Sequence, residues 1–254
     1  MEGVTPLLAA SEELPFTRKL AQLVSLSQDE MMILAELQSA TRTVQRHRDI
    51  IMEGRNYSSI VIIIEGSAVR FRILRDGRRQ IINIVLPGDI VGIFGPCIER
   101  SLYSTQSLTK IVVATIPLTR MNALFATNPQ LVTKIFLYFS CELTIYAEHL
   151  VDLGRRSASE RIAHFLLELL TRLQAVGLAE DRSYKIPLTQ KLIADALGLS
   201  IPHVNRVLRR LREDNLVVIE DQQVTIKDID GLSELADFEP SYLSRFSGNE
   251  LLVG

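Results

Sequence analysis

A run of basic side chains in the last third of the sequence is the part best suited to chemistry, and that chemistry is recognition of an anion. Between Ala196 and Arg212 there is no acidic residue. At 3.6 residues per turn, the polar side chains gather on one helix face: His203, Asn205, Arg206, Arg209, Arg210 and Arg212. A guanidinium matches both a phosphate and the O6–N7 edge of guanine. This face predicts nucleic-acid contact; the alternative is a solvated charged face in another helical module.

Two short helices are expected to position this face. Thr189 caps the first, and the apolar side of that helix consists of Leu192, Ile193, Ala196 and Leu197. Gly198 allows a sharp turn, Ser200 caps the second helix, and Pro202 lies in its first turn. The inner face of the second helix consists of Val204, Leu208 and Leu211. This pattern predicts a helix-turn-helix, and the segments LVVIE and QVTIK around Asp221-Gln222 predict a β-wing after it.

A long helix is predicted upstream, with Asn128 as its cap and Pro129 as its first residue. Its apolar residues alternate at spacings of 4 and 3, which keeps one seam facing a partner helix. They are Val132, Phe136, Phe139, Leu143, Tyr146, Leu150 and Leu153. The seam predicts a two-fold dimer; the alternative is a helix packed on its own barrel. Residues 154–157 then read as a hinge, and Ser157 with Glu160 forms a capping box for the next helix.

The N-terminal half reads as helices followed by a β-barrel. The stretch to Gln38 is expected to be helical, with Ser27 and Glu30 at capping-box spacing. From Thr41 to Pro117, short runs rich in Ile and Val are separated by glycines 11 or 12 residues apart: Gly54, Gly66, Gly77 and Gly88. Residues 75–78, Arg-Asp-Gly-Arg, predict a tight hairpin between two of these strands.

Composition and motifs exclude several classes of function. Hydrophobic residues make up 47% and charged residues 23%, and the net charge is −2, so DNA binding would depend on how charge is distributed. Cys97 and Cys141 lack metal-ligand spacing, and no nucleophile, metal or phosphate motif is found. No catalytic residue, metal or cofactor is therefore predicted. Without a signal peptide or a transmembrane run, we expect a cytoplasmic protein with no membrane partner.

The order of these features resembles the Crp/Fnr family of bacterial transcription regulators over nearly the whole chain. Four features match the family in order. They are the regularly spaced glycines, the PGDIVGIFG turn at 87–95, the helix that starts at Asn-Pro and the helix that starts at Glu-Arg-Ile. The resemblance implies an α+β chain: a cyclic-nucleotide-binding-like β-barrel (jelly roll), a long dimerisation helix and a C-terminal winged helix-turn-helix. We expect a sensory domain at 1–127, the dimerisation helix and hinge at 128–156, the DNA-binding domain at 157–230 and a tail at 231–254.

The family implies a non-enzymatic regulator that binds double-stranded DNA as a homodimer on a roughly palindromic site, with RNA polymerase as a further partner. Arg206 matches the base-reading arginine, Ser200 a phosphate contact and Arg209 a further backbone contact. Ile201 and Pro202 depart from the polar pair of well-known members, so His203 and Asn205 are expected to share base reading with Arg206. Thr189 and Gln190 complete the expected DNA-binding set.

The sensory chemistry of cyclic-nucleotide-binding members is missing. Their glutamate falls on Ile93, their Arg-Ser pair on Leu102 and Tyr103, and their polar pair on the dimer helix on Tyr146 and Ala147. Arg100 substitutes only if the loop is shifted, so the candidate effector loop is Gly88, Gly92, Arg100 and Ser104.

The ligands for other effectors of the family are also missing from the sequence. An iron–sulfur cluster needs about four cysteines, and the chain has two. The four histidines, His47, His149, His164 and His203, form no haem-ligand grouping. Cys97 lies in the modified turn, but no residue that would activate its thiolate is evident, so the effector stays unassigned. The competing function is a regulatory module that acts on a protein partner.

Overall fold

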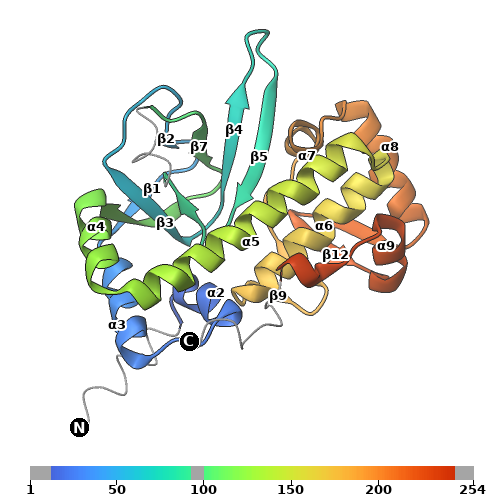
Figure 1. The fold of residues 1–254 in the computed structure, drawn as a ribbon. Coiled ribbons are helices and arrows are strands. Elements are labelled where there is room, and N and C mark those ends of the chain that lie inside the picture. The colour runs from blue at the N-terminus through green and yellow to red at the C-terminus, as the bar shows by residue number, and fades with distance from the viewer. Residues whose placement is uncertain (1–12, 93–99, 244–254) are drawn as a thin grey trace. The chain divides into compact units, whose positions relative to one another are not determined.

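The computed structural model describes residues 13–92 and 100–243 (Figure 1). By its internal contacts the chain divides into two compact units. Within the described residues, the first unit holds 13–70, 84–92 and 100–140, and the second holds 71–83 and 141–243. The second unit therefore combines the C-terminal part of the chain with a β-hairpin from the N-terminal half.

The N-terminal strands form two four-stranded sheets. One has the order β1-β8-β3-β6, with strands Thr41–Val44, Ile111–Pro117, Ser59–Glu65 and Ile90–Val91. The other has the order β2-β7-β4-β5, with strands Asp49–Ile51, Ser104–Ser107, Ala68–Ile73 and Arg79–Val85. Apolar side chains from both sheets share one core, which includes Ile51, Val61, Ile63, Val85 and Val113. The β-barrel predicted from Thr41 to Pro117 is confirmed.

The regularly spaced glycines lie at turns of this barrel. Gly54, Gly66, Gly77 and Gly88 all have positive φ angles, between 78° and 85°. Gly66 is also crowded, because a Cβ there would lie 2.6 Å from Thr109 Oγ1 and 2.7 Å from the Lys110 carbonyl oxygen. Only glycine satisfies both the backbone and the space at this turn.

The predicted hairpin between β4 and β5 is present. The Leu74 amide donates to the Arg78 carbonyl at 2.8 Å, and the Gly77 amide donates to the Leu74 carbonyl at 2.9 Å. The closure leaves Ile73 and Leu74 exposed beside the turn.

Short helices flank the barrel strands in sequence. The N-terminal helices are α2 (Pro15–Leu23) and α3 (Gln28–Leu37). The capping box of α3 is formed: the Glu30 amide donates to Ser27 Oγ at 3.2 Å, and the Ser27 amide donates to Glu30 Oε2 at 2.7 Å. Helix α4 (Leu118–Thr127) was not predicted. It buries only Met121 and Leu124, which is too few residues for a periodic signal.

Helix α5 (Pro129–Gly154) is the long helix predicted from the sequence. One of its faces is buried against its own chain through Leu131, Ile135, Tyr138 and Ile145. Three residues of the predicted seam are largely exposed: Phe136 by 67%, Leu143 by 64% and Leu150 by 72%. Leu153 is also exposed, whereas Val132, Phe139 and Tyr146 are half-buried. The helix thus carries one buried apolar stripe and a second stripe that is open at Phe136, Leu143 and Leu150.

The C-terminal part forms a winged helical domain. It consists of helices α6 (Ala158–Ala175), α7 (Gln190–Leu197), α8 (Ile201–Glu213) and α9 (Ile229–Ala236), with a 3₁₀ turn η1 (Pro240–Leu243). A sheet of order β11-β12-β10-β9 joins strands Val217–Glu220, Gln223–Ile226, Ser183–Lys185 and Ala179–Glu180. Helix α6 packs against α7, α8, α9 and η1 and is the centre of this domain.

Two sequence predictions for this domain are confirmed and one element was missed. The capping box of α6 is formed, with the Ser157 amide 2.6 Å from Glu160 Oε2. Asp221 and Gln222 both have positive φ (47° and 66°), as a two-residue type I′ hairpin requires. The pair β9–β10 was not predicted, because strands of two and three residues show no alternation.

A buried ion cluster ties α5 to α6 within the second unit. His149 Nε2 lies 2.8 Å from Glu168 Oε2, and Arg172 Nη1 donates to Glu168 Oε1 at 3.0 Å and to Asn83 Oδ1 at 2.9 Å. Burial by itself would raise the pKa of the Glu168 carboxyl, but the charges of His149 and Arg172 lower it to about 2. Burial by itself would lower the pKa of His149, but the Glu168 carboxylate outweighs this and raises it. The cluster therefore keeps the Glu168 carboxylate charged although it is buried.

Candidate nucleic-acid interface

Helix α7 begins and ends as its sequence predicts. Thr189 is its cap, and its hydroxyl accepts a hydrogen bond from the Leu192 amide at 3.1 Å. Gly198 ends the helix with φ 65° and ψ 33°, a left-handed conformation that turns the chain sharply into α8. The buried residues are Leu192, Ile193, Ala194 and Leu197. Ala194 thus takes the inner position expected for Ala196, which is only half-buried.

Helix α8 begins at the predicted place, but its cap differs from the prediction. Ser200 has the extended backbone of an N-cap residue, and its carbonyl accepts from the amides of His203 and Val204 at 3.0 Å. Its hydroxyl makes no capping hydrogen bond. With Pro202 in the first turn, that turn has one fewer amide that needs a partner. The side-chain cap predicted for Ser200 is wrong, and the hydroxyl stays available to an outside acceptor.

The inner face of α8 consists of Val204, Val207 and Leu211, all buried. The prediction placed Leu208 there, but Leu208 is half-buried on the opposite side. The predicted outer face is open to solvent at Asn205, Arg206, Arg209, Arg210 and Arg212, while His203 is half-buried.

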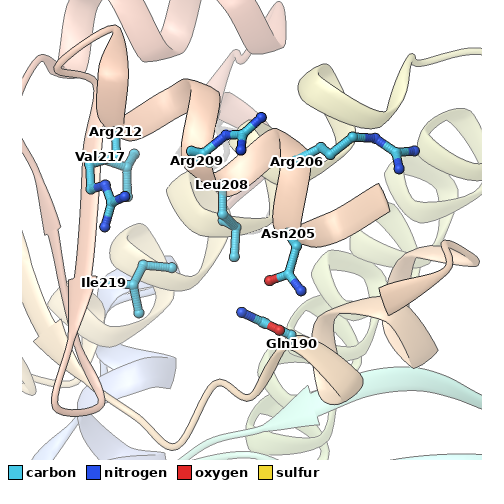
Figure 2. Close-up of a pocket in the computed structure, with 8 residues that line it drawn as sticks. All are labelled: Gln190, Asn205, Arg206, Leu208, Arg209, Arg212, Val217 and Ile219. Atoms are coloured by element: carbon cyan, nitrogen blue, oxygen red, sulfur yellow. The ribbon is translucent and has the colours of Figure 1, made fainter. Parts of the chain in front are cut away.

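The outer face of α8 borders a hollow of about 370 Å³ between α7, α8 and β11. Figure 2 shows Gln190 from α7 and Asn205 from α8 pointing toward one another across it. Leu208, Val217 and Ile219 supply apolar surface, and Arg206, Arg209 and Arg212 supply positive charge. The structure thus brings together four of the predicted DNA-binding residues: Gln190, Asn205, Arg206 and Arg209.

The arginines of α8 differ in how they are paired. Arg209 lies 3.6 Å from Glu213 and Arg210 lies 3.6 Å from Asp214, each one turn away and with both partners exposed. Such surface pairs contribute little and are easily exchanged for a phosphate. Among the described residues, Arg206 and Arg212 have no ion-pair partner, so both are ready to meet an external anion. Arg212 was noted on the basic face but was not among the predicted contacts.

A contact missed by sequence reasoning fixes the end of α7. Arg79 Nε, from the β4–β5 hairpin, donates to Asp195 Oδ2 at 2.8 Å. Gln80 Nε2 donates to the Ala196 carbonyl at 2.9 Å. Both contacts lie within the second unit. They join residues 116 positions apart, so no local sequence pattern could predict them.

The predicted effector loop does not form a comparable site in its described part. Ser104 Oγ accepts from the Glu53 amide at 3.0 Å, and the Gly88 amide donates to the Ile63 carbonyl at 2.8 Å. Gly92 has φ 84°, and Arg100 is exposed. Ile93 and Cys97 lie outside the described residues.

Neither a metal-ligand cluster nor a membrane-spanning helix occurs among the described residues. Over 13–92 and 100–243, no group of three or more His, Cys, Asp or Glu side chains is arranged to hold a metal ion. None of the helices in those ranges has the length and apolarity needed to cross a membrane.

Two parts of the chain match known domain families. Residues 41–128 match the cyclic nucleotide-binding domain, and residues 160–235 match the Crp-like helix-turn-helix domain. The first match begins where β1 begins, and the second runs from the first turn of α6 into the last turn of α9.

Relatives with assigned roles are transcription regulators. The transcriptional activator protein FnrA of Stutzerimonas stutzeri is 29% identical over 84% of this chain and 87% of its own length. The transcriptional activatory protein AadR of Rhodopseudomonas palustris is 32% identical over 67% of this chain and 70% of its own length. The nitrogen fixation regulation protein FixK of Bradyrhizobium diazoefficiens is also 32% identical, over 67% and 71%.

Solved structures share the fold. FixK2 from Bradyrhizobium japonicum has a TM-score of 0.69 and 24% identity, covering 77% of this chain and 96% of that one. The CRP-family transcriptional regulator TTHB099 from Thermus thermophilus has a TM-score of 0.64 and 22% identity, covering 78% and 97%.

Proposed function

Because the chain belongs to the Crp/Fnr family of DNA-binding transcription regulators, we propose that it acts as a homodimer on a two-fold-symmetric DNA site. The sensory domain would be residues 1–127, and the dimerisation helix with its hinge would be 128–156. The DNA-binding domain would be 157–230, followed by a tail at 231–254. Since its target is DNA, its place of action is the cytoplasm, and RNA polymerase is a further partner at promoters.

The observation that carries this proposal is the open, basic outer face of α8 beside the hollow. Arg206, exposed and unpaired among the described residues, reads a guanine edge. Asn205 suits an adenine edge, and its neighbour Gln190 approaches from α7. His203 completes the reading set from the first turn of α8.

Sequence-independent contacts surround this reading set. Arg209 and the uncapped hydroxyl of Ser200 bind phosphates, with Thr189 at the start of α7. Pro202 offers no donor or acceptor in its side chain, so the base pair opposite it is read by shape or by its neighbours.

The open seam of α5 supports the homodimer. Phe136, Leu143 and Leu150 are spaced by one heptad each and are all largely exposed, an arrangement that suits a helix packed on its symmetry mate. Val132, Phe139, Tyr146 and Leu153 complete the proposed seam. Two such chains place two α8 helices about 34 Å apart, one helical turn of DNA.

The residues at the cyclic-nucleotide positions support a different effector. An anionic phosphate inside a barrel needs a charged or hydrogen-bonding partner. Leu102 is exposed and apolar, and Tyr103 accepts a hydrogen bond from Ser101 through its carbonyl. We propose that no cyclic nucleotide regulates this chain.

The experiment is selection of bound duplexes from a random DNA pool with purified protein and no added ligand, at about 0.15 M salt. We expect enrichment of a two-fold-symmetric motif with half-sites about 10 base pairs apart, centre to centre. Failure of a folded dimer to enrich any motif would contradict binding in the unliganded state. It would favour the alternative in which the barrel regulates a protein partner.

A further inference from the structure

The polar centre of the hinge region is His164, which is 1% exposed and lies in the second turn of α6. Its ring faces two carboxylates of α5: Nδ1 lies 3.1 Å from Asp152 Oδ2, and Nε2 lies 3.6 Å from Glu148 Oε2. Arg156 in the hinge donates to the same two carboxylates, at 2.9 Å and 3.0 Å. The end of α5, the hinge and the start of α6 therefore meet at one side chain.

Two aromatic residues from the end of the described chain cover this histidine. The Tyr242 ring stacks on the His164 ring, with centroids 6.0 Å apart and planes at 7°. The Phe238 ring meets it edge-on, with centroids 5.2 Å apart. We call Phe238 and Tyr242 the aromatic clamp.

Polar contacts connect the clamp to both helices. The Tyr242 hydroxyl lies 3.3 Å from His164 Nε2 on α6. Thr144 Oγ1 on α5 donates to the Tyr242 carbonyl at 3.1 Å. Burial raises the pKa of Tyr242, so its hydroxyl keeps its proton and stays a hydrogen-bond donor. The clamp therefore holds α5 and α6 at once, and all of these residues belong to the second unit.

The clamp lies beyond the family's DNA-binding domain. The match to that domain ends at residue 235, before Phe238 and Tyr242. Neither residue lines the hollow at the proposed DNA face. The clamp thus lies outside the matched domain, at the joint that the proposed dimer would use to orient its two α8 helices.

We infer that Phe238 and Tyr242 are positioning residues for DNA binding, which fix the α5–α6 angle so that both α8 helices of a dimer meet their half-sites together. The inference rests on the proposed homodimer. At the hinge itself, a Cβ at Gly154 would have nothing within 4 Å, so Gly154 does not set the α5–α6 angle by packing. The angle depends instead on the contacts of Arg156 and His164 with α5 and on the clamp that packs on His164. Binding of the second half-site is intramolecular, and its strength depends on geometry held in advance.

The test measures how strictly the protein demands the correct half-site spacing. Inserting one base pair moves a half-site by about 3.4 Å and rotates it by about 34°. We expect the wild type to prefer the selected spacing over the lengthened one by roughly tenfold or more. In Phe238→Ala/Tyr242→Ala this ratio should fall toward one. Because it compares two duplexes on the same sample, a partly unfolded fraction cancels.

A second readout separates positioning from general stability. Affinity for a duplex with a single half-site should stay within about twofold of wild type, while affinity for the full site falls roughly tenfold. Tyr242→Phe keeps the stacked ring and should retain most of the spacing preference. Glu234→Ala, an exposed change on α9 one turn before Phe238, is the matched control and should behave as wild type.

Three outcomes would overturn the inference. Equal losses on full site and half-site, with the spacing ratio intact, would show that the clamp only stabilises the fold. An unchanged spacing ratio with unchanged affinity would show that it does nothing for DNA binding. A wild type that does not prefer two half-sites over one would overturn the dimeric function itself, and the positioning role with it.

Discussion

At the scale of single residues, the structure separates side chains that share a helix but differ in their surroundings. Arg206 and Arg210 are one turn apart on α8, and both are exposed. Arg206 borders the hollow shared with α7, whereas Arg210 does not and lies 3.6 Å from Asp214. Charge alone therefore does not distinguish the two arginines as candidates for base reading, whereas their position relative to α7 does.

This difference gives a matched pair of variants. Arg206→Ala should weaken binding to the selected duplex by about 1–3 kcal/mol and relax preference at one base pair, because a bidentate contact to a base is lost. Arg210→Ala removes the same charge and should lower affinity for selected and random duplexes alike. Competition binding at fixed salt measures both. A loss from Arg206→Ala that is equal on random DNA would rule out base reading.

The barrel glycines allow backbone conformation and crowding to be distinguished. Gly66 and Gly77 have nearly the same φ, 81° and 84°, but only at Gly66 would an added Cβ lie closer than 3 Å to neighbouring atoms. Gly77→Ala should cost about 1 kcal/mol from its left-handed backbone. Gly66→Ala should cost at least about 2 kcal/mol more, because Thr109 and the backbone at Lys110 must move. Urea unfolding of both variants is the measurement, and equal losses would contradict the role of crowding.

At the scale of elements, the sequence predicts what local chemistry determines. Capping boxes at Ser27 and Ser157 and the turn at Gly198 were predictable, because each depends on residues three or four positions apart. The inner face of α8 was predicted only in part. Val207 and Leu208 are adjacent and both apolar, so helical periodicity accepts either one, and packing on the rest of the domain selects Val207.

Contacts between distant segments were not predictable. The aromatic clamp joins residues 78 positions apart, and the bond from the β4–β5 hairpin to α7 spans 116. Neither Tyr242 nor Arg79 stands out in type or spacing within its own segment. For the candidate site, the basic face of α8 could therefore be predicted, whereas the hollow that makes Arg212 and Leu208 part of it could not.

The buried ion cluster predicts how stability responds to pH. The pKa of His149 is higher in the folded protein than its ordinary value of 6.5, because of Glu168. A raised pKa adds stability that is fully present below pH 6.5 and lost as pH rises through the folded value. We expect His149→Gln to cost about 2 kcal/mol near pH 6 and less near pH 9.

At acid pH, Glu168 gives the opposite dependence of stability on pH. The pKa of Glu168 is lowered to about 2, so its contribution is present above about pH 4.5 and lost as pH falls toward 2. Unfolding free energies of wild type and His149→Gln, measured by urea between pH 5 and 9, test the histidine term. A difference that does not shrink as pH rises would show that the two groups are not a charged pair.

At the scale of the whole molecule, a chain with a net charge of −2 binds DNA only if its charges are segregated. Residues 197–212 contain five arginine and histidine side chains and no carboxylate, so the excess of acidic residues lies elsewhere. A single such face gives weak, salt-sensitive contact. Two faces held by the proposed dimer would multiply the affinity, so the seam of α5 would matter as much as the arginines.

The proposed seam of α5 makes a prediction about oligomeric state. In the proposed dimer, replacing Leu143 and Leu150 with glutamate would place like charges opposite one another across the two-fold axis, where the wild type would bury apolar side chains. We expect a folded monomer in sedimentation equilibrium and roughly a 100-fold loss of affinity for the two-half-site duplex, with little change on a single half-site. Leu178→Glu is the control, because Leu178 is also an exposed leucine of the second unit but lies outside α5. A Leu143→Glu/Leu150→Glu protein that still sediments as a dimer would place the interface on another surface, and α5 would then need a different explanation for its second apolar stripe.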